Sequence, residues 1–399
     1  MDYNTKTFCA AAWFGLRNEQ FGDFQLCSKI DRAASEFSGG LAHSWPDHSV
    51  SEFVNSEYAQ YVRKNLTAGE ALPECHQCWQ TESLGMASTR TNSNDTVTGN
   101  RGHQLESTWV HAYMNQKQDY TQDHLIMADV KLTNTCNFAC AMCTPSDSSK
   151  IYSAWNRTQQ HPIIQLHLEQ APGYLDQVRS HFVDKNNHKL LSELLAQHPR
   201  HIKLLGGEPL LDQRALTMLA DSESAERTCL SFVTNGSVSL LDTTSRLHRY
   251  QNVHYTVSLE GTGAVQDYLR RGSAWHDVSR NIQEFQQVHP HNINIHVTVQ
   301  ALNLLHLLQL LEWCQQHQLP VTFGQVQEPA YLSLEAMPEQ LRCQSSLESY
   351  QAQVQGLAQH VSQTRHQPRL LQQLRQFLDW YDPGQDWRTI IPEWQPYLS

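Results

Sequence analysis

The chain has 399 residues, a formal net charge of −11 and no long basic block. It can therefore bury a large core, and its charge argues against a surface that tracks nucleic-acid phosphates. No apolar run is long enough to span a bilayer, and the N-terminal stretch MDYNTKTFCA is polar, which predicts a cytoplasmic protein without a membrane segment. Seven of the ten cysteines are clustered, which indicates metal ligation; Cys229, Cys314 and Cys343 stand apart and are expected to be buried thiols.

The first segment, residues 1 to about 122, contains four cysteines in two groups. Cys9, Gly22 and Cys27 follow the order C-x12-G-x4-C, and LPECHQCW adds Cys75 and Cys78 as a C-x-x-C pair. Four thiolates in two groups suit a site that is ligated entirely by protein. By itself, the set fits a four-cysteine zinc site about as well as an iron–sulfur cluster.

Local patterns suggest how the two cysteine groups meet. Gly22 is expected to make a tight turn between two short strands, Trp13-Phe14 and Phe24-Leu26. The stretch SVSEFVNSEYAQYVRKNLTAGE predicts one amphipathic helix, with Ser51 as its cap and Gly69 at its end. The polar residues 89–123 predict a linker.

The central segment, residues 123 to about 330, alternates apolar strands with helical patterns, which predicts an α/β fold with a parallel sheet. Ligands of such sheets lie at the carboxyl ends of the strands. Strands are expected near 127–133, 202–206, 230–235, 253–259, 293–300 and 320–326, and helices near 187–198, 212–220, 274–288 and 302–318.

The first of these strands leads into a loop with three cysteines. In MADVKLTNTCNFACAMCTP, Cys136, Cys140 and Cys143 have the spacing C-x3-C-x2-C. Thiolates select iron–sulfur clusters, zinc or Cu(I). The next cysteine is Cys229, whereas a closed zinc site needs four ligands. A four-iron cubane, by contrast, can leave one iron open for a small molecule.

At this spacing, the loop resembles the cluster loop of radical S-adenosylmethionine (SAM) enzymes, although Met142 replaces the aromatic residue that often precedes the third cysteine. The resemblance implies a partial (β/α)6 TIM-like barrel and a [4Fe–4S] cluster whose open iron binds SAM. It also implies cleavage of SAM to methionine and a 5′-deoxyadenosyl radical that abstracts a substrate hydrogen. An external electron donor such as flavodoxin or ferredoxin is expected.

Polar residues after the later strands are similar to the family's SAM motifs. GGEP at 206–209 follows the second strand, and in the family this segment meets the amino group of SAM. SLEG at 258–261 resembles the segment that approaches the ribose and methionine, and Arg270 matches an arginine that pairs with the SAM carboxylate. A plain turn after the third strand and a solvated helix face for Arg270 or Arg271 remain alternatives. The candidate SAM contacts are Gly206, Gly207, Glu208, Pro209, Asn235, Ser258, Glu260, Arg270 and Gln300, with Asn303 as a weaker candidate.

The N-terminal cysteine pattern resembles the twitch module, the shortened form of the SPASM domain, although here it precedes the barrel. This resemblance implies an auxiliary iron–sulfur cluster of the [4Fe–4S] type held by Cys9, Cys27, Cys75 and Cys78, with structural zinc as the alternative.

The last segment, residues 331–399, predicts helices that pack on the barrel or cover its open edge. LSLEAMPEQLR is expected to begin a helix capped by Ser333, and ESYQAQVQGLAQHVSQT and LLQQLRQFLDWY predict two more. Tyr381, Trp387 and Trp394 are expected to pack in the core rather than line a substrate site. The segment holds no cysteine pair, so no second auxiliary cluster is expected.

The resemblance favours an oxidoreductase-type radical SAM enzyme that modifies a ribosomal peptide by a crosslink, a thioether or epimerisation. One alternative is oxidation or rearrangement of a small molecule such as an aminosugar or a nucleotide-derived alcohol. Another is a non-catalytic iron–sulfur redox protein, against which the GGEP and SLEG segments argue. No catalytic acid or base can be assigned from the sequence.

Overall fold

Six strands follow the period-two apolar pattern of the central segment, and all six predicted strands are confirmed. The structure, a computed structural model, describes residues 6–39, 44–83, 87–98, 125–184, 187–326, 328–345 and 361–398. The strands are β3 (Met127–Lys131), β5 (His201–Leu205), β6 (Cys229–Thr234), β7 (Val253–Ser258), β9 (Ile293–Val299) and β10 (Val321–Gln325). The fold is mixed α/β with mostly parallel strand pairing, as expected for a partial barrel.

The chain folds into two compact units. The first unit comprises Met1–Lys131, Asn186–Lys203 and Ser222–Cys229, and the second comprises Leu132–Lys185, Leu204–Asp221 and Leu230–Ser399. The expected domain boundary at 122–123 lies outside the described residues, and the one at 330–331 falls within the second unit. The three-domain division therefore stays a prediction.

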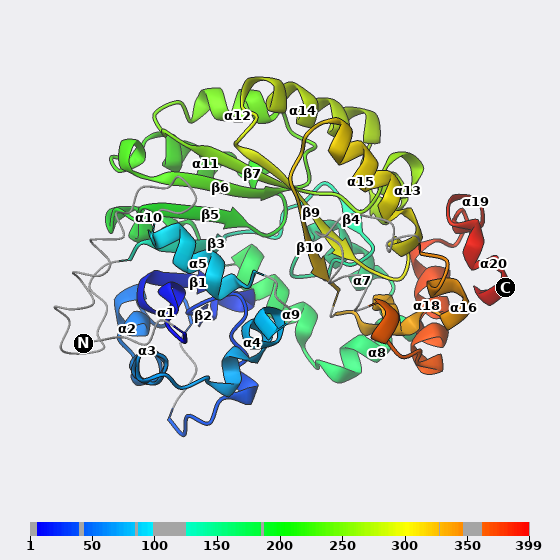
Figure 1. Cartoon of the computed structure of the whole chain (residues 1–399), viewed down its shortest axis with the longest axis horizontal. Helices are drawn as coiled ribbons and strands as arrows, with labels where there is room; N and C mark the ends of the chain where they lie inside the picture. The colour runs from blue at the N-terminus through cyan, green and yellow to red at the C-terminus, as the bar shows by residue number, and fades with distance from the viewer. Residues whose placement is uncertain are drawn as a thin grey trace. The chain divides into compact units, whose positions relative to one another are not determined.

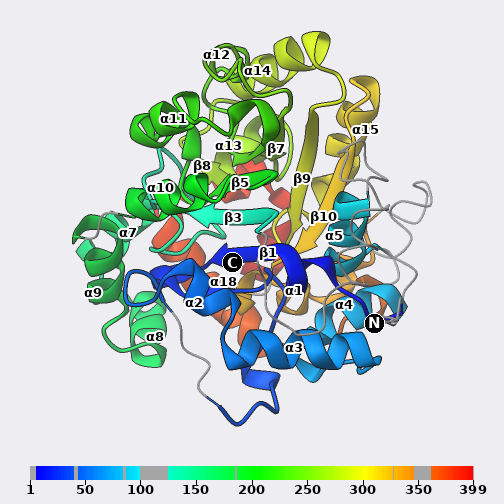
Figure 2. The same ribbon diagram turned by 90° about the vertical axis from the view of Figure 1, so that its left-hand side faces the viewer.

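In the first unit, β1 (Gly15–Asn18) pairs antiparallel with β2 (Phe24–Gln25) and parallel with β3. Figure 2 shows α2 and α3 on the same side of β1. The helices described in this unit are α1 (Ala10–Phe14), η1 (Gln20–Gly22), η2 (Arg32–Ala34), α2 (Val50–Val54), α3 (Glu57–Ala68), η3 (Pro73–Cys75), α4 (His76–Ser83), α5 (Thr89–Thr98), α10 (His188–Ala196) and η6 (Ala225–Arg227).

Three local predictions in this unit are wrong. Trp13-Phe14 ends a short helix, because the alanines before it favour helix, and the strand begins only at Gly15. The single amphipathic helix is two helices: Ser49 caps the first through a capping box with Glu52, and Ser56 caps the second. Ser51 is therefore not the cap, whereas Gly69 does end the second helix.

The polar stretch predicted as a linker begins with a helix. Thr89–Thr98 forms α5, and the rest of that stretch lies outside the described residues. The sequence TRTNSNDTVT is almost free of apolar residues, so it has no hydrophobic periodicity to reveal a helix. Hydrogen bonds from its polar side chains to neighbouring segments hold it in place instead.

In the second unit, β6, β7, β9 and β10 pair in parallel, in that order. The buried side chains of β7 pack under helices: the rings of Tyr255 and Phe285 meet edge to face with centroids 5.0 Å apart. In Figures 1 and 2, α12 and α14 lie together over one side of β7. On the other side, alternate residues of β7 and β9 are half-exposed, and Thr256 donates to Asn294 at 2.9 Å.

The predicted helices of the central segment are also confirmed, and a two-stranded sheet accompanies them. β4 (Ala139–Cys140) pairs antiparallel with β8 (Arg270–Arg271). The helices of this part of the second unit are α7 (Ser149–Arg157), α8 (Pro162–Gln170), α9 (Tyr174–Arg179), the π-helical turn η4 (Ser180–Asp184), η5 (Pro209–Leu211), α11 (Gln213–Ala220), α12 (Leu240–Arg246), α13 (Gly263–Leu269), α14 (Trp275–Val288), η7 (Leu304–His306) and α15 (Leu307–Gln316).

The C-terminal segment belongs to the second unit and ends in helices. The helix predicted for LLQQLRQFLDWY is α18 (Pro368–Tyr381), and Tyr381, Trp387 and Trp394 are buried, as core packing requires. The single helix predicted at LSLEAMPEQLR is two short ones, Leu334–Ala336 and Glu339–Arg342, and Ser333 precedes the first of them without a side-chain cap. Most of the helix predicted after them lies outside the described residues. The remaining helices are η8 (Ala330–Leu332), η9 (Leu334–Ala336), α16 (Glu339–Arg342), α19 (Trp387–Ile390), η12 (Pro392–Trp394) and α20 (Gln395–Leu398).

The composition predicted no membrane-spanning segment and three buried isolated cysteines. Among the described helices, none combines the length and apolar character needed to cross a membrane. Of the isolated cysteines, Cys314 is buried and Cys229 is half-buried, but Cys343 is exposed, so the prediction that all three are buried thiols is wrong for Cys343.

Candidate functional site

The three-cysteine loop is fixed in the second unit by backbone pairing and by serine side chains. Cys140 stands opposite Arg270 in the β4–β8 pair, and Ala141 N donates to Leu269 O at 2.8 Å. The hydroxyl of Ser148, which caps α7, donates to Phe138 O at 2.6 Å. These bonds tie the loop to β8 and to the start of α7.

The thiols of this loop influence one another electrostatically. Burial raises the pKa of Cys136 to about 11. The Cys143 thiol donates a hydrogen bond to Cys140 and lowers the pKa of Cys140 to about 7, with help from Arg270, while the pKa of Cys143 itself rises. Binding of a metal centre here would release protons, because thiolates are the ligands.

The GGEP segment packs directly on the cysteine loop. Glu208 N donates to Thr135 O at 2.7 Å. Gly207 has φ of +54°, and a Cβ there would lie 2.4 Å from Thr135 O. No side chain fits between the two segments, so the glycine is required both for its backbone conformation and for the close approach.

Glu208 ties together the ends of two neighbouring strands. Its fully buried carboxylate accepts from Leu210 N at 3.0 Å, from Thr234 Oγ1 at 2.9 Å and from Asn235 N at 2.6 Å. Burial raises the pKa of Glu208. A carboxylate offers about four acceptor sites, so about one remains for another donor.

Asn235 links this bridge to the first cysteine. Its Nδ2 donates to Cys136 Sγ at 3.9 Å and to Asn137 Oδ1 at 2.9 Å. Its Oδ1 accepts from Ser237 N at 2.9 Å. Hydrogen bonds to ligand sulfur are among the factors that set the potential of iron–sulfur clusters.

A buried ion pair lies on the other side of the loop. Arg270 Nη1 donates to Glu260 Oε1 at 3.2 Å, and Glu260 Oε2 accepts from Thr298 N at 3.2 Å and Asn303 Nδ2 at 3.3 Å. Burial raises the pKa of Glu260 to about 8 even though Arg270 opposes the shift. Burial opposes the charge of Arg270, but the Cys140 sulfur and Glu260 outweigh it and raise the pKa of Arg270.

Several polar atoms around this ion pair have no hydrogen-bond partner within the described parts of the chain. They are Arg270 Nε, Gln266 Nε2 and both amide atoms of the fully buried Gln300. Unpaired buried polar atoms are costly and call for an explanation, of which an absent ligand is one. Ser258, at the end of β7, is half-exposed.

The sequence of residues 130–314 matches the family model described as the Radical SAM superfamily. This segment, residues 130–314, is that of a radical SAM superfamily enzyme. No curated protein matches its sequence. Among solved structures, anSMEcpe with bound AdoMet and Cp18Cys peptide is 15% identical, with 55% of this chain and 58% of that one covered and a TM-score of 0.35.

Two further structures are similar at the same level. SuiB of Streptococcus suis bound to S-adenosylmethionine is 13% identical, with 80% of this chain and 63% of that chain covered and a TM-score of 0.34. TYW1 with a lysine-pyruvate adduct bound is 16% identical, with 50% of this chain and 65% of that chain covered and a TM-score of 0.30. The radical SAM chain thus covers less than two thirds of the length of each of these three structures.

Radical SAM enzymes use a [4Fe–4S] cluster and SAM, and the residues of this radical SAM chain fit such a pair. Three soft thiol ligands share one loop, the GGEP turn leaves backbone beside it, and unpaired buried polar atoms surround Arg270. Within the described ranges, no three His, Cys, Asp or Glu side chains are arranged so that they could hold a metal ion as they stand. Ligation requires deprotonation of the cysteines, because thiolates are the ligands.

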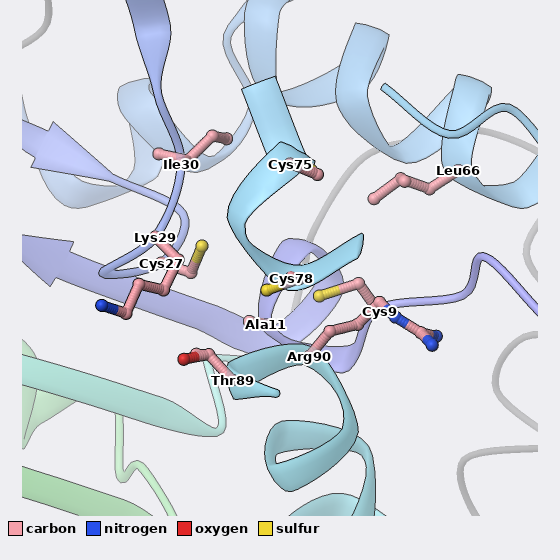
Figure 3. Close-up of a pocket in the computed structure, with 10 residues that line it drawn as sticks. All are labelled: Cys9, Ala11, Cys27, Lys29, Ile30, Leu66, Cys75, Cys78, Thr89 and Arg90. Carbon is pink, nitrogen blue, oxygen red and sulfur yellow. The ribbon is translucent and has the colours of Figure 1, made fainter. Parts of the chain in front are cut away.

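The first unit of the radical SAM chain gathers its four cysteines around one pocket (Figure 3). The pocket encloses about 330 Å³ of empty space, part of it open to solvent, and its lining includes Cys9, Cys27, Cys75 and Cys78. Burial raises the pKa of Cys9 to about 11, of Cys27 to about 12 and of Cys75 above its usual value, and neighbouring thiols add to each rise. The predicted set is thus brought together.

Some residues of these two sites have no clear sequence signal. Thr298 contributes a backbone N–H, and Tyr381 Oη lies 3.1 Å from Ala139 O and 2.9 Å from Tyr268 O, across the back of the β4–β8 pair. Arg90 lines the four-cysteine pocket from a helix that the sequence does not predict. Asn137, by contrast, lies inside the cysteine motif and could have been included.

Substitution of Gly207 tests the close packing of the GGEP turn. Gly263 has the same φ of +54°, but no atom lies within 4 Å of the place that a Cβ would take there, so Gly263→Ala is a matched control for backbone strain. We expect Gly263→Ala to cost about 1–2 kcal/mol, and Gly207→Ala to cost about 1–3 kcal/mol more because Thr135 O must move. Anaerobic thermal unfolding measures both; equal midpoints would contradict the packing argument.

Proposed function

We propose that Cys136, Cys140 and Cys143 hold the [4Fe–4S] cluster of this radical SAM enzyme and that SAM binds its open iron. The observation that carries the proposal is the β4–β8 pairing, in which the buried cation of Arg270 stands opposite Cys140. A permanent cation beside a thiolate-rich loop is suited to an anionic carboxylate that binds at the same metal.

The remaining candidate residues lie in the segments that end or follow β5, β6, β7 and β9. We assign the SAM amino group to the GGEP segment Gly206–Pro209, and the carboxylate to Arg270. Ser258 and Glu260 are assigned to the ribose and methionine, and Asn235 and Gln300 to further polar contacts. The unpaired atoms of Gln300 and Arg270 support this assignment, because a bound polar ligand would satisfy them.

When bound, the cluster and SAM supply a 5′-deoxyadenosyl radical that abstracts a substrate hydrogen, after an electron arrives from a donor such as flavodoxin or ferredoxin. The chain's own contribution is to bind and orient SAM and to keep water away. Burial of Cys136, Cys140, Glu208 and Glu260 at the loop supports the second role.

Removal of one cluster cysteine and of the cation tests this assignment. Cys140→Ala should abolish 5′-deoxyadenosine formation under dithionite.

Arg270→Met should weaken SAM binding by about tenfold or more, because a charge-assisted contact is lost. Arg271→Met is the matched control, since Arg271 is exposed and its guanidinium lies 4.1 Å from the Tyr381 ring centroid. Calorimetry measures affinity; a wild-type chain that does not bind SAM would favour a non-catalytic iron–sulfur redox protein.

We further propose that Cys9, Cys27, Cys75 and Cys78 hold an auxiliary [4Fe–4S] cluster. Their convergence on one pocket supports a shared metal centre. Contacts between the segments support it as well: Asp31 N donates to Glu74 O at 2.8 Å and Ser35 Oγ to Glu74 Oε1 at 2.9 Å, which ties the loop after Cys27 to the residue before Cys75. Zinc is the alternative occupant.

Metal analysis distinguishes the two occupants. The anaerobically reconstituted chain should contain about eight irons, as two four-iron clusters require. About four irons and one zinc would instead indicate a structural zinc site. Loss of half of the iron in Cys75→Ala, with SAM cleavage retained, would assign the second cluster to this pocket.

For the substrate we propose a ribosomally made peptide that undergoes oxidative modification. The edge of β10 supports a peptide. Pro320 O accepts from Ile295 N, and Val326 N donates to Val299 O. The backbone N–H and C=O groups of the even-numbered residues therefore point toward β9. The backbone groups of Val321, Phe323 and Gln325 point away from β9, and no described residue bonds them. An extended peptide could add here as a strand, and the net charge of −11 suits a cationic one.

A proline at the edge of β10 tests this preference. Gln325→Pro removes one outward N–H without disturbing the β9 ladder, and the exposed side chain carries no packing. Lysine-rich peptides should raise 5′-deoxyadenosine formation several-fold in Gln325→Ala and clearly less in Gln325→Pro, with equal rates when no peptide is added. Stimulation by aminosugars or nucleosides but not by peptides would support the small-molecule alternative.

A further inference from the structure

An asparagine on α5 bonds the backbone on both sides of Cys9. Ala10 N donates to Asn94 Oδ1 at 2.7 Å, and Asn94 Nδ2 donates to Phe8 O at 3.0 Å. These two bonds grip the backbone on either side of Cys9. Cys9 itself is the N-cap residue of α1 with extended backbone angles, and its carbonyl accepts from Ala12 N at 3.2 Å.

One turn earlier on α5, a buried arginine joins the Cys9 segment to the helix that carries Cys78. Arg90 Nη1 donates to Phe8 O at 2.8 Å, while its Nε and Nη2 contact the two carboxylate oxygens of Glu82 at 3.0 Å and 2.5 Å. Its guanidinium also lies 5.0 Å from the ring centroid of Trp79, next to Cys78. Glu82 and Trp79 both belong to α4.

Together, these contacts join all the segments that carry the four cysteines. The Glu74 bonds tie the Cys27 loop to Cys75, but they do not reach Cys9. The Arg90 and Asn94 bonds supply the missing tie, between Cys9 and the Cys78 helix. Arg90 and the neighbouring Thr89 also line the four-cysteine pocket, as Figure 3 shows. Helix α5 thus belongs to the pocket although it contributes no cysteine.

We propose that Asn94 and Arg90 are positioning residues for the metal centre at Cys9, Cys27, Cys75 and Cys78. They fix the backbone on both sides of Cys9 relative to the helix that carries Cys78, which limits the positions open to the Cys9 thiol. The inference rests on the proposed auxiliary site. Residues that orient metal ligands typically change metal affinity by about 10–100-fold when they are removed.

The test isolates the auxiliary site by placing every variant in a Cys136→Ala, Cys140→Ala, Cys143→Ala background. Asn94→Leu removes the hydrogen bonds to Ala10 N and Phe8 O, and Arg90→Met removes the ion pair with Glu82 on α4. Arg90→Lys keeps the charge but cannot span Glu82 and Phe8 O together. Asn65→Leu on α3 is the matched control, because the Asn65 side chain bonds Tyr61 O within its own helix. Metal content and the rate of metal release to a chelator are measured, with circular dichroism and the thermal midpoint as checks on folding.

Asn94→Leu and Arg90→Met should release metal about tenfold faster or more than the background and Asn65→Leu, with Arg90→Lys close to Arg90→Met. Should Asn94→Leu fail to fold, Asn94→Asp, which keeps the acceptor for Ala10 N, is judged by the same criterion. Release rates equal to that of Asn65→Leu in a metal-loaded background would overturn this inference alone. A background chain that takes up no metal would overturn the auxiliary site and the inference together.

Discussion

The site depends on a charged side chain that is shut away from water beside three thiols. Arg270 is buried, and burial of an ion is expensive unless partners surround it. Glu260 provides one partner, and Thr298 N and Asn303 hold Glu260 in turn. The backbone of Arg270 is meanwhile paired with Cys140, so its charge cannot move away from the loop without breaking a sheet.

On the GGEP side of the cysteine loop, the close packing depends on a glycine that has no side chain. Gly207 allows the GGEP turn to touch Thr135, and Glu208 then joins that turn to Thr234 and Asn235. Cys136 receives a hydrogen bond from Asn235 as a consequence of this chain of contacts. Ends of strands that are distant in sequence are therefore fixed against one another by buried hydrogen bonds, which lose little to solvent competition.

The strands and most central helices could be predicted because burial imposes a clear periodicity on them. The cysteines and the residues at the strand ends could be chosen as site candidates because their chemistry is rare and their spacing is specific, and their roles stay predictions. Local details were predicted wrongly where periodicity was weak. The aromatic end of the alanine-rich helix Ala10–Phe14 has the composition of a strand. Ser49 and Ser51 are both plausible caps, and the hydrogen bonds between Ser49 and Glu52 decide for Ser49. Helix α5 is held by Asn94 and Arg90 rather than by an apolar face, and tertiary hydrogen bonds of this kind leave no pattern in a sequence.

The tyrosine at the end of α18 has a consequence for how the protein matures. The hydroxyl of Tyr381 reaches Ala139 O across 242 positions of sequence, and it also meets Tyr268 O and Leu269 O behind the β4–β8 pair. Contacts of such long range form late, because closing a large loop costs entropy before any contact repays it. During synthesis, the cysteine loop emerges 242 residues before Tyr381, so this support becomes available to the loop only after α18 has been made.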